Sequence, residues 1–193
     1  MYWHVLRWAR DVCFNPSKNT KADYKYGDFI KRLMITSLVT GILGTIIAII
    51  SFSALGVNES LVSIFVTIPA FLLTAVISPF IGAAISHFFG KIVFRLMDKE
   101  YKKTYNAYAY LEIPNFLFGW IPVIGSLIGG IWGIIVGVYA LSNQQKISKG
   151  RALLVILIPV IIIVAIIIAL AAAAFSYITS SLTPFSDLYE IPA

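Results

Sequence analysis

The stretch Ile113–Gln145, IPNFLFGWIPVIGSLIGGIWGIIVGVYALSNQQ, decides how this chain folds, because none of its 33 residues is charged. As a single helix it would be about 50 Å long, well beyond the ~30 Å hydrocarbon core of a bilayer. Pro122 offers a break near its middle. We therefore expect the chain to double back there, with one crossing at about 105–119 and another at about 122–142. A re-entrant hairpin at Pro122 would keep the same sidedness and stays an alternative.

The rest of the chain is equally apolar. Of its 193 residues 59% are hydrophobic and 12% are charged, whereas about a quarter of the residues in a soluble domain are charged. Long uncharged runs predict three more crossings, at about 33–55, 60–82 and 152–176. We predict an all-α polytopic membrane helical bundle, with five transmembrane helices in 33–178 and an N-terminal amphipathic interfacial helix. Residues 1–32 supply that helix and a linker, and 179–193 form a short tail.

The positions of the basic residues give an independent reason to expect five crossings. All fifteen Lys and Arg residues fall within 1–32, 91–103 and 146–151. Five crossings place these three segments in the cytoplasm, as the positive-inside rule requires, with the C-terminus on the other side. A single crossing at 113–145 would instead translocate the last of them. A retained N-terminus fits the seven basic residues that precede the first apolar run.

Two segments outside the crossings are amphipathic. Residues 1–14 place apolar and charged side chains on opposite helix faces, which is typical of a helix at the headgroup level. The alternative is a helix packed on its own protein. Residues 84–103 show a similar cationic pattern. The residues expected to face lipid or a partner are Trp3, Arg7, Trp8, Arg10, Lys91 and Arg95.

Small residues recur every four positions, which places them on one helix face. Gly125, Gly129, Gly133 and Gly137 form such a stripe in the fourth crossing, and Ser78 and Gly82 begin another in the second. Ala165, Ala169 and Ala173 repeat the pattern in the fifth. We expect these stripes to pack helices within the bundle, and a seam between the chains of a homo-oligomer is the alternative.

Glu112 is the principal ionisable residue within an apolar run, and such residues mark candidate functional sites. A broken helix at Pro114 would let Tyr110, Glu112 and Asn115 line a polar cavity, as in ion-coupled transporters. Alternatively, Glu112 lies near the cytoplasmic interface, where it snorkels to water or pairs with a lysine. His87 is expected at the interface. No nucleophile–base motif, metal-ligand cluster or cofactor motif is present, so we expect no enzyme, no metal and no cofactor.

Residues 109–159, AYLEIPNFLFGWIPVIGSLIGGIWGIIVGVYALSNQQKISKGRALLVILIP, resemble the Yip-one domain family of Ypt/Rab-interacting five-span membrane proteins. The features that match its short, prokaryote-like members are Tyr110 with Pro114, Pro122 before a glycine-rich span with Trp132, and Gly150-Arg151-Ala152 before the last span. The resemblance implies a non-enzymatic role in membrane trafficking or shaping. In eukaryotic members an Asp-Leu-Tyr-Gly motif precedes the first span. Here Asp187-Leu188-Tyr189 occurs instead in the C-terminal tail and is not a positional match, which argues against direct binding of a Rab-type GTPase.

Two functions are consistent with these features. The first is a membrane-shaping or trafficking protein that acts on the bilayer, including anionic headgroups, through its cytoplasmic amphipathic helices. The second is a small transporter or channel with a polar site around Glu112 and Asn115. Nucleic acid is not an expected partner, because the basic residues follow from topology rather than from a soluble basic face. A multi-pass location is expected, in the cell membrane of a prokaryote or the Golgi or endoplasmic reticulum of a eukaryote.

Overall fold

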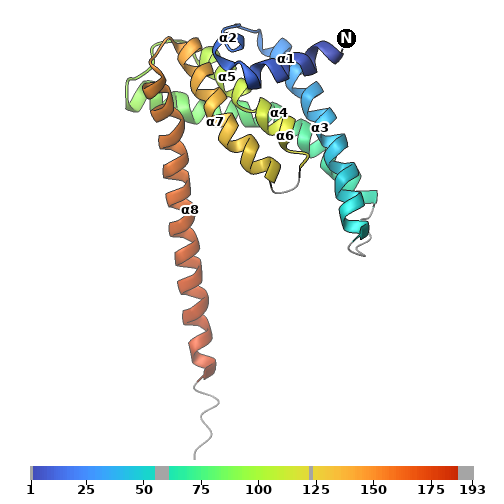
Figure 1. Ribbon diagram of the computed structural model, residues 1–193. Coiled ribbons are helices and arrows are strands. Elements are labelled where there is room, and N and C mark those ends of the chain that lie inside the picture. Colours follow the sequence, from blue (N-terminus) through green and yellow to red (C-terminus); the bar gives the residue numbers. More distant parts are fainter. Residues whose placement is uncertain (1, 55–60, 122–123, 187–193) are drawn as a thin grey trace, which may run out of the picture. The chain divides into compact units, whose positions relative to one another are not determined.

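The computed structural model describes residues 2–54, 61–121 and 124–186 (Figure 1). Every regular element in these ranges is a helix, which confirms the predicted all-α class. The helices, in chain order, are α1 (Tyr2–Phe14), α2 (Pro16–Asn19), α3 (Tyr26–Ala54), α4 (Leu61–His87), the π-helix η1 (Phe88–Val93), α5 (Tyr101–Leu111), α6 (Ile113–Phe118), α7 (Ile124–Gln145) and α8 (Lys149–Ser186).

Four of the described helical stretches are long and apolar enough to cross a bilayer: Tyr26–Ile47, Ile68–Val93, Ile124–Gln145 and Lys149–Thr179. This chain is therefore an integral membrane protein with a polytopic helical bundle. The crossing predicted at 105–119 is built from α5 and α6, each of which is too short to span hydrocarbon alone. The number of five crossings remains a prediction.

Two helices extend beyond the predicted crossings. The helix α4 continues through Pro69 and Pro79 to His87, because a proline removes only one backbone hydrogen bond and is tolerated inside membrane bundles. The amphipathic stretch that follows is helical only as far as Val93, and the chain turns at Arg95, whose φ of 52° lies in the left-handed region. The last helix, α8, continues to Ser186, and residues 187–193 of the predicted tail lie outside the described residues.

The chain divides into two compact units, residues 1–156 and 157–193. In the second unit α8 continues as a single helix, and its described side chains from Val160 to Thr179 are exposed. Ala165, Ala169 and Ala173 are among them, so nothing within this unit covers that stripe.

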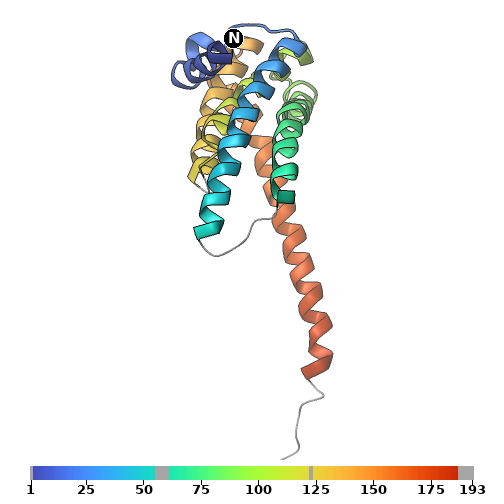
Figure 2. The same cartoon turned by 90° about the vertical axis from the view of Figure 1, so that its right-hand side faces the viewer.

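In the first unit the short helices α5 and α6 lie among the longer ones. The helix α5 packs against α4 and α7, and α6 packs against α3 and α7 (Figures 1 and 2). Tyr105 and Tyr110 are the largest fully buried side chains, and both belong to α5. The turn after α6 brings Trp120 beside Gly44 of α3, where a Cβ would lie 3.7 Å from the Trp120 Cα. At the start of α3 the ring centroids of Tyr26 and Tyr105 lie 4.8 Å apart, so the α5–α6 segment runs beside α3 from Tyr26 to Gly44, which is about 27 Å of helix.

The three basic segments lie at one end of the first unit. Lys103 and Lys102 pair with Asp23 at 2.6 and 3.4 Å, which joins the second segment to the first. The Lys99 backbone N–H donates to Gln145 Oε1 at 3.1 Å, which joins it to the residue before the third. This is the arrangement that the distribution of lysines and arginines requires if all of them occupy one aqueous compartment.

Candidate functional site

Glu112 lies at the junction between α5 and α6. The next helix begins with Ile113, and Pro114 stands in its first turn, where the missing N–H would be unpaired in any case. The Glu112 N–H donates to Tyr108 O at 3.2 Å, and its own carbonyl accepts from the Phe116 N–H at 3.1 Å. The backbone therefore continues almost without deviation, and the junction sets a carboxyl group in the middle of the helix bundle.

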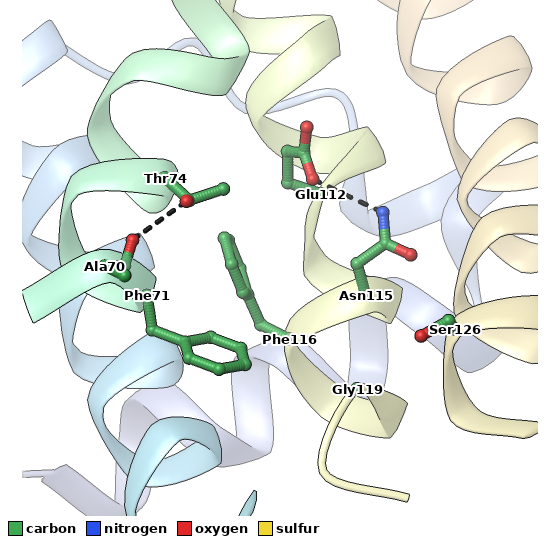
Figure 3. A pocket seen from close by; sticks show the side chains of 8 residues that line it. All are labelled: Ala70, Phe71, Thr74, Glu112, Asn115, Phe116, Gly119 and Ser126. Atoms are coloured by element: carbon green, nitrogen blue, oxygen red, sulfur yellow. Dashed lines mark hydrogen bonds between the residues drawn. The ribbon is translucent and has the colours of Figure 1, made fainter. Parts of the chain in front are cut away.

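The carboxyl group of Glu112 has two hydrogen-bonding partners from different elements. The Ser78 hydroxyl of α4 donates to one oxygen. The Asn115 amide donates to the other at 3.3 Å (Figure 3). No ion pair to Glu112 occurs in the described part of the chain, so the sequence alternative in which it pairs with a lysine is not the arrangement seen here.

A pocket of about 420 Å³ opens beside this carboxyl group. Figure 3 shows its walls: α4 contributes one side, the α5–α6 segment the floor, and α7 the opposite side. The residues that line it are Ala70, Phe71, Thr74, Glu112, Asn115, Phe116, Gly119 and Ser126. Because Ala70, Thr74 and Ser126 are exposed, the pocket is open at the flank of the bundle between α4 and α7.

Of the four residues of the predicted polar site, two line the pocket and two do not. Glu112 and Asn115 meet at the pocket. Pro114 is buried in the first turn of α6. Tyr110 points away from the pocket, and its hydroxyl donates to the Ala22 carbonyl at 3.1 Å. Helix geometry explains the separation, since residues two positions apart lie on nearly opposite faces.

The small-residue stripe of α4 lies against α5. Ser78 contacts Glu112, and the hydroxyls of Ser86 and Tyr108 form a hydrogen bond. Between them, a Cβ at Gly82 would come within 2.6 Å of the Tyr108 ring. The tyrosine ring thus occupies the space that the missing side chain leaves.

The glycine stripe of α7 lies against α5 and α6. All four of its glycines are buried. A Cβ at Gly129 would come within 2.9 Å of the Asn115 Cα, and one at Gly133 within 2.8 Å of the Leu111 carbonyl oxygen. The glycine stripe of α7 is therefore in close contact with the backbone of α5 and α6.

The apolar face of α1 packs on the protein itself. Ala9, Val12 and Cys13 are fully buried, and the Trp8 ring lies 5.8 Å from Phe29 and 6.1 Å from Tyr110, measured between centroids. Trp8 therefore faces the protein interior and not lipid, because the aromatic residues of α3 and α5 offer it a more complete apolar contact. For this face of α1, the structure shows the second of the two arrangements considered from the sequence, a helix packed on its own protein.

The opposite face of α1 remains exposed. Trp3 is 74% exposed, and it lines a surface hollow of about 240 Å³ together with Leu6, Arg7 and Arg10. Arg10 also pairs with its neighbour Asp11 at 2.7 Å. Two guanidinium groups and an indole therefore share one surface, a combination suited to the boundary between headgroups and acyl chains.

A second exposed surface surrounds η1. Lys91 and Arg95 are exposed, and so are four large apolar side chains of the same segment, Phe88, Ile92, Val93 and Phe94. The segment is held by backbone hydrogen bonds from Leu96 N and Met97 N to the Gly90 carbonyl, at 2.7 and 3.2 Å. We name the six exposed residues the η1 surface.

A layer of neutral amide side chains lies at the basic end and was not predicted from the sequence. Gln144 donates to the carbonyls of Thr20 and Ala22 at 3.0 and 2.9 Å, and Asn106 donates to Asp23 Oδ1 at 2.7 Å. The Trp132 indole N–H donates to the Cys13 carbonyl at 2.9 Å, at the end of α1. The signal in the sequence was the run Ser142–Gln145, four polar uncharged residues that close an apolar helix.

The described residues contain no group of three or more His, Cys, Asp or Glu side chains that could hold a metal ion. Cys13 is a buried free thiol, and burial raises its pKa to about 12, which makes it a poor nucleophile at neutral pH. His87 lies beside Thr104, whose hydroxyl is 2.8 Å from its Nδ1, at the end of α4. The chemistry that this site offers is therefore binding through one carboxyl group and one amide.

Residues 10–180 match the protein family described as Yip1 domain. No curated protein and no solved structure matches the chain.

Proposed function

This chain belongs to the Yip1 domain family, and from that premise we propose that it is a non-enzymatic protein that shapes membranes in trafficking or membrane organisation. The observation that carries the proposal is the η1 surface. Phe88 and Ile92 are 50% and 63% exposed although both are large and apolar, and Lys91 stands between them. An exposed apolar group with adjacent cations is the composition that inserts into a leaflet and attracts anionic lipid.

The hollow on α1 supports the same role. Arg7 and Arg10 lie at the same end of the first unit as the η1 surface, since α1 and the 91–103 segment are tied together through the linker at Asp23. Two insertion sites at one end of a bundle widen one leaflet relative to the other, which is a physical route to curvature. On this reading the lipid bilayer, and its anionic headgroups in particular, is the partner.

The experiment uses the purified full chain, reconstituted into vesicles with or without phosphatidylserine. We expect the wild-type chain to reduce vesicle diameter or form tubules, visible by electron cryomicroscopy, and to do so more strongly with the anionic lipid. The variant Ile92→Asn/Val93→Asn removes apolar insertion, and Lys91→Gln/Arg95→Gln removes the charge. Both are expected to lose most of the effect.

A matched control keeps this test specific. Lys18→Gln/Lys21→Gln removes two exposed cations from the same end of the first unit but not from the η1 surface. We expect it to deform vesicles as the wild type does. If all variants and the wild type give the same vesicle diameters, membrane shaping through the η1 surface is wrong.

For orientation we propose five crossings with the N-terminus in the cytoplasm. The support is that the three basic segments occupy one end of the first unit, which the positive-inside rule assigns to the cytoplasm. A tag after Ala193 is then reachable only from outside intact cells. Access from the cytosol would contradict an odd number of crossings.

The pocket beside Glu112 favours a second candidate function, that of a small transporter. An ionisable residue within a membrane bundle and open to a cavity is a common feature of ion pathways. Proteoliposomes loaded with a pH or cation reporter test it, with Glu112→Gln as the variant. Equal flux through wild-type, variant and protein-free vesicles would contradict transport.

A further inference from the structure

The pocket beside Glu112 lies at the depth of the hydrocarbon core. Its hydrogen-bond partner Ser78 is near the middle of the span Ile68–Val93. Thirteen residues separate Ser78 from Lys91, which is about 20 Å along a helix. A solute that dissolves in the acyl region can therefore reach the opening between α4 and α7 without entering the aqueous phase.

The described residues supply no counter-charge to the Glu112 carboxyl group. Glu112 accepts hydrogen bonds from Ser78 and Asn115, and both donors are neutral. The described residues give it no lysine, arginine or histidine partner. A carboxylate in a medium of low dielectric constant favours a positive counter-charge strongly, because water is not there to screen it.

The walls of the pocket restrict the kind of cation. Phe71 and Phe116 line the same pocket as Glu112, and Figure 3 shows Phe116 between the other two, so the pocket combines one carboxyl group with apolar and aromatic surface. Aromatic faces attract cations, and apolar walls favour an organic body. A bare metal ion fits poorly, since hard cations require six or more oxygen ligands and the lining offers few. The volume of about 420 Å³ lies within the range of small-molecule sites.

From these observations we propose that the pocket binds a lipophilic organic cation, which enters from the membrane between α4 and α7 and pairs with Glu112. This inference goes beyond membrane shaping, and it requires no transport. The cation occupies the pocket with its charge toward the carboxylate and its apolar groups against Phe71 and Phe116.

The probe is tetraphenylphosphonium, tested against the full chain in detergent by equilibrium dialysis. Tetraphenylborate has nearly the same shape with the opposite charge, which makes it a matched control. We expect saturable binding of one phosphonium ion per chain and no saturable binding of the borate. Glu112→Gln is expected to weaken phosphonium binding by about thirtyfold or more, the usual effect of removing one member of a desolvated charge pair.

Two further variants separate loss of binding from loss of folding. Ser126→Leu places a larger apolar side chain on the exposed rim of the pocket, where it blocks entry without disturbing a buried contact. It is expected to abolish binding, whereas Ser148→Leu and Glu100→Gln, at exposed positions outside the lining, are expected to bind as the wild type does.

Three results would each overturn the proposal. The first is the absence of saturable phosphonium binding to the wild type. The second is equal saturable binding of the borate, which would mean that the pocket recognises apolar surface and not charge. The third is unchanged affinity in Ser126→Leu, which would place the bound ion elsewhere even if Glu112→Gln fails to fold.

Discussion

Replacement of Gly133 by alanine tests whether the glycine stripe of α7 packs inside one bundle. The added Cβ would lie 2.8 Å from the carbonyl oxygen of Leu111, closer than real Cβ atoms approach a neighbour. That oxygen belongs to the backbone of α5, so a helix has to move. Overpacking of this kind costs about 1–3 kcal/mol.

Alanine also favours a helix over glycine, by up to about 1 kcal/mol, and this gain would obscure the result in a single measurement. Gly130 provides the correction. It lies in the same helix, and a Cβ placed there has no atom within 4 Å. Since the propensity gain is common to both variants, Gly130→Ala is expected to exceed Gly133→Ala in free energy of unfolding by about 1–3 kcal/mol.

The assay is unfolding of the purified chain in mixed micelles, followed by circular dichroism as the denaturing detergent is increased. Self-association of each variant is measured in parallel by analytical ultracentrifugation. Equal stability of the two variants, with self-association lost only in Gly133→Ala, would refute the argument and make the stripe a seam between chains.

Three further predictions concern the basic end of the bundle. Partial burial raises the pKa of Asp23, but hydrogen bonding and charge from Lys103 and Lys102 lower it by more, so it lies below its usual value. The ionised Asp23 carboxylate therefore stabilises the folded chain above the unfolded-state pKa near 4, and this stabilisation is lost as the pH falls through the lower folded-state pKa. Asp23→Asn should therefore reduce the loss of unfolding free energy on acidification, by less than about 1 kcal/mol because the Asp23 side chain is partly exposed. The exposed control variant Asp98→Asn should leave that loss unchanged. Gln144→Leu removes the amide hydrogen bonds to the carbonyls of Thr20 and Ala22, which should lower the free energy of unfolding by about 1–3 kcal/mol and accelerate tryptic cleavage after Lys21. An unchanged cleavage rate would show that these hydrogen bonds do not hold the linker in place. Cys13, buried and with its pKa raised to about 12, should resist maleimide in the folded chain at neutral pH and react once dodecyl sulfate unfolds it, and equal rates in both states would contradict its burial.

The sequence predicted the helical class and the family because those depend on long runs of residues. An uncharged stretch such as Ile124–Gln145 has one stable form in lipid, so its length and composition suffice. The meeting of Glu112 with Asn115 followed equally from their spacing of three on one helix face. The predicted end of α4 was earlier than observed because prolines such as Pro79 are poorer helix breakers in a bundle than in water.

Contacts between segments far apart in the chain could not be predicted from the sequence pattern. The position of Trp8 against Tyr110 depends on a partner 102 residues away, and amphipathicity alone does not distinguish protein from lipid as the apolar neighbour. The pocket depends on where Ser126 of α7 stands relative to Ala70 of α4, which only packing decides. The separation of Tyr110 from Glu112 required the direction of each side chain around the helix.

Because the amide layer at the basic end is uncharged, added salt should affect its hydrogen bonds much less than it affects interactions of the exposed charged side chains. Asn143 and Gln144 hold the linker through groups that carry no net charge, so added salt leaves these bonds almost untouched. The attraction that we propose between the exposed lysines and arginines and anionic headgroups would decay within about 10 Å at 0.1 M ionic strength. Under the proposed function, added salt would therefore weaken binding to anionic headgroups while the hydrogen bonds of the amide layer persist.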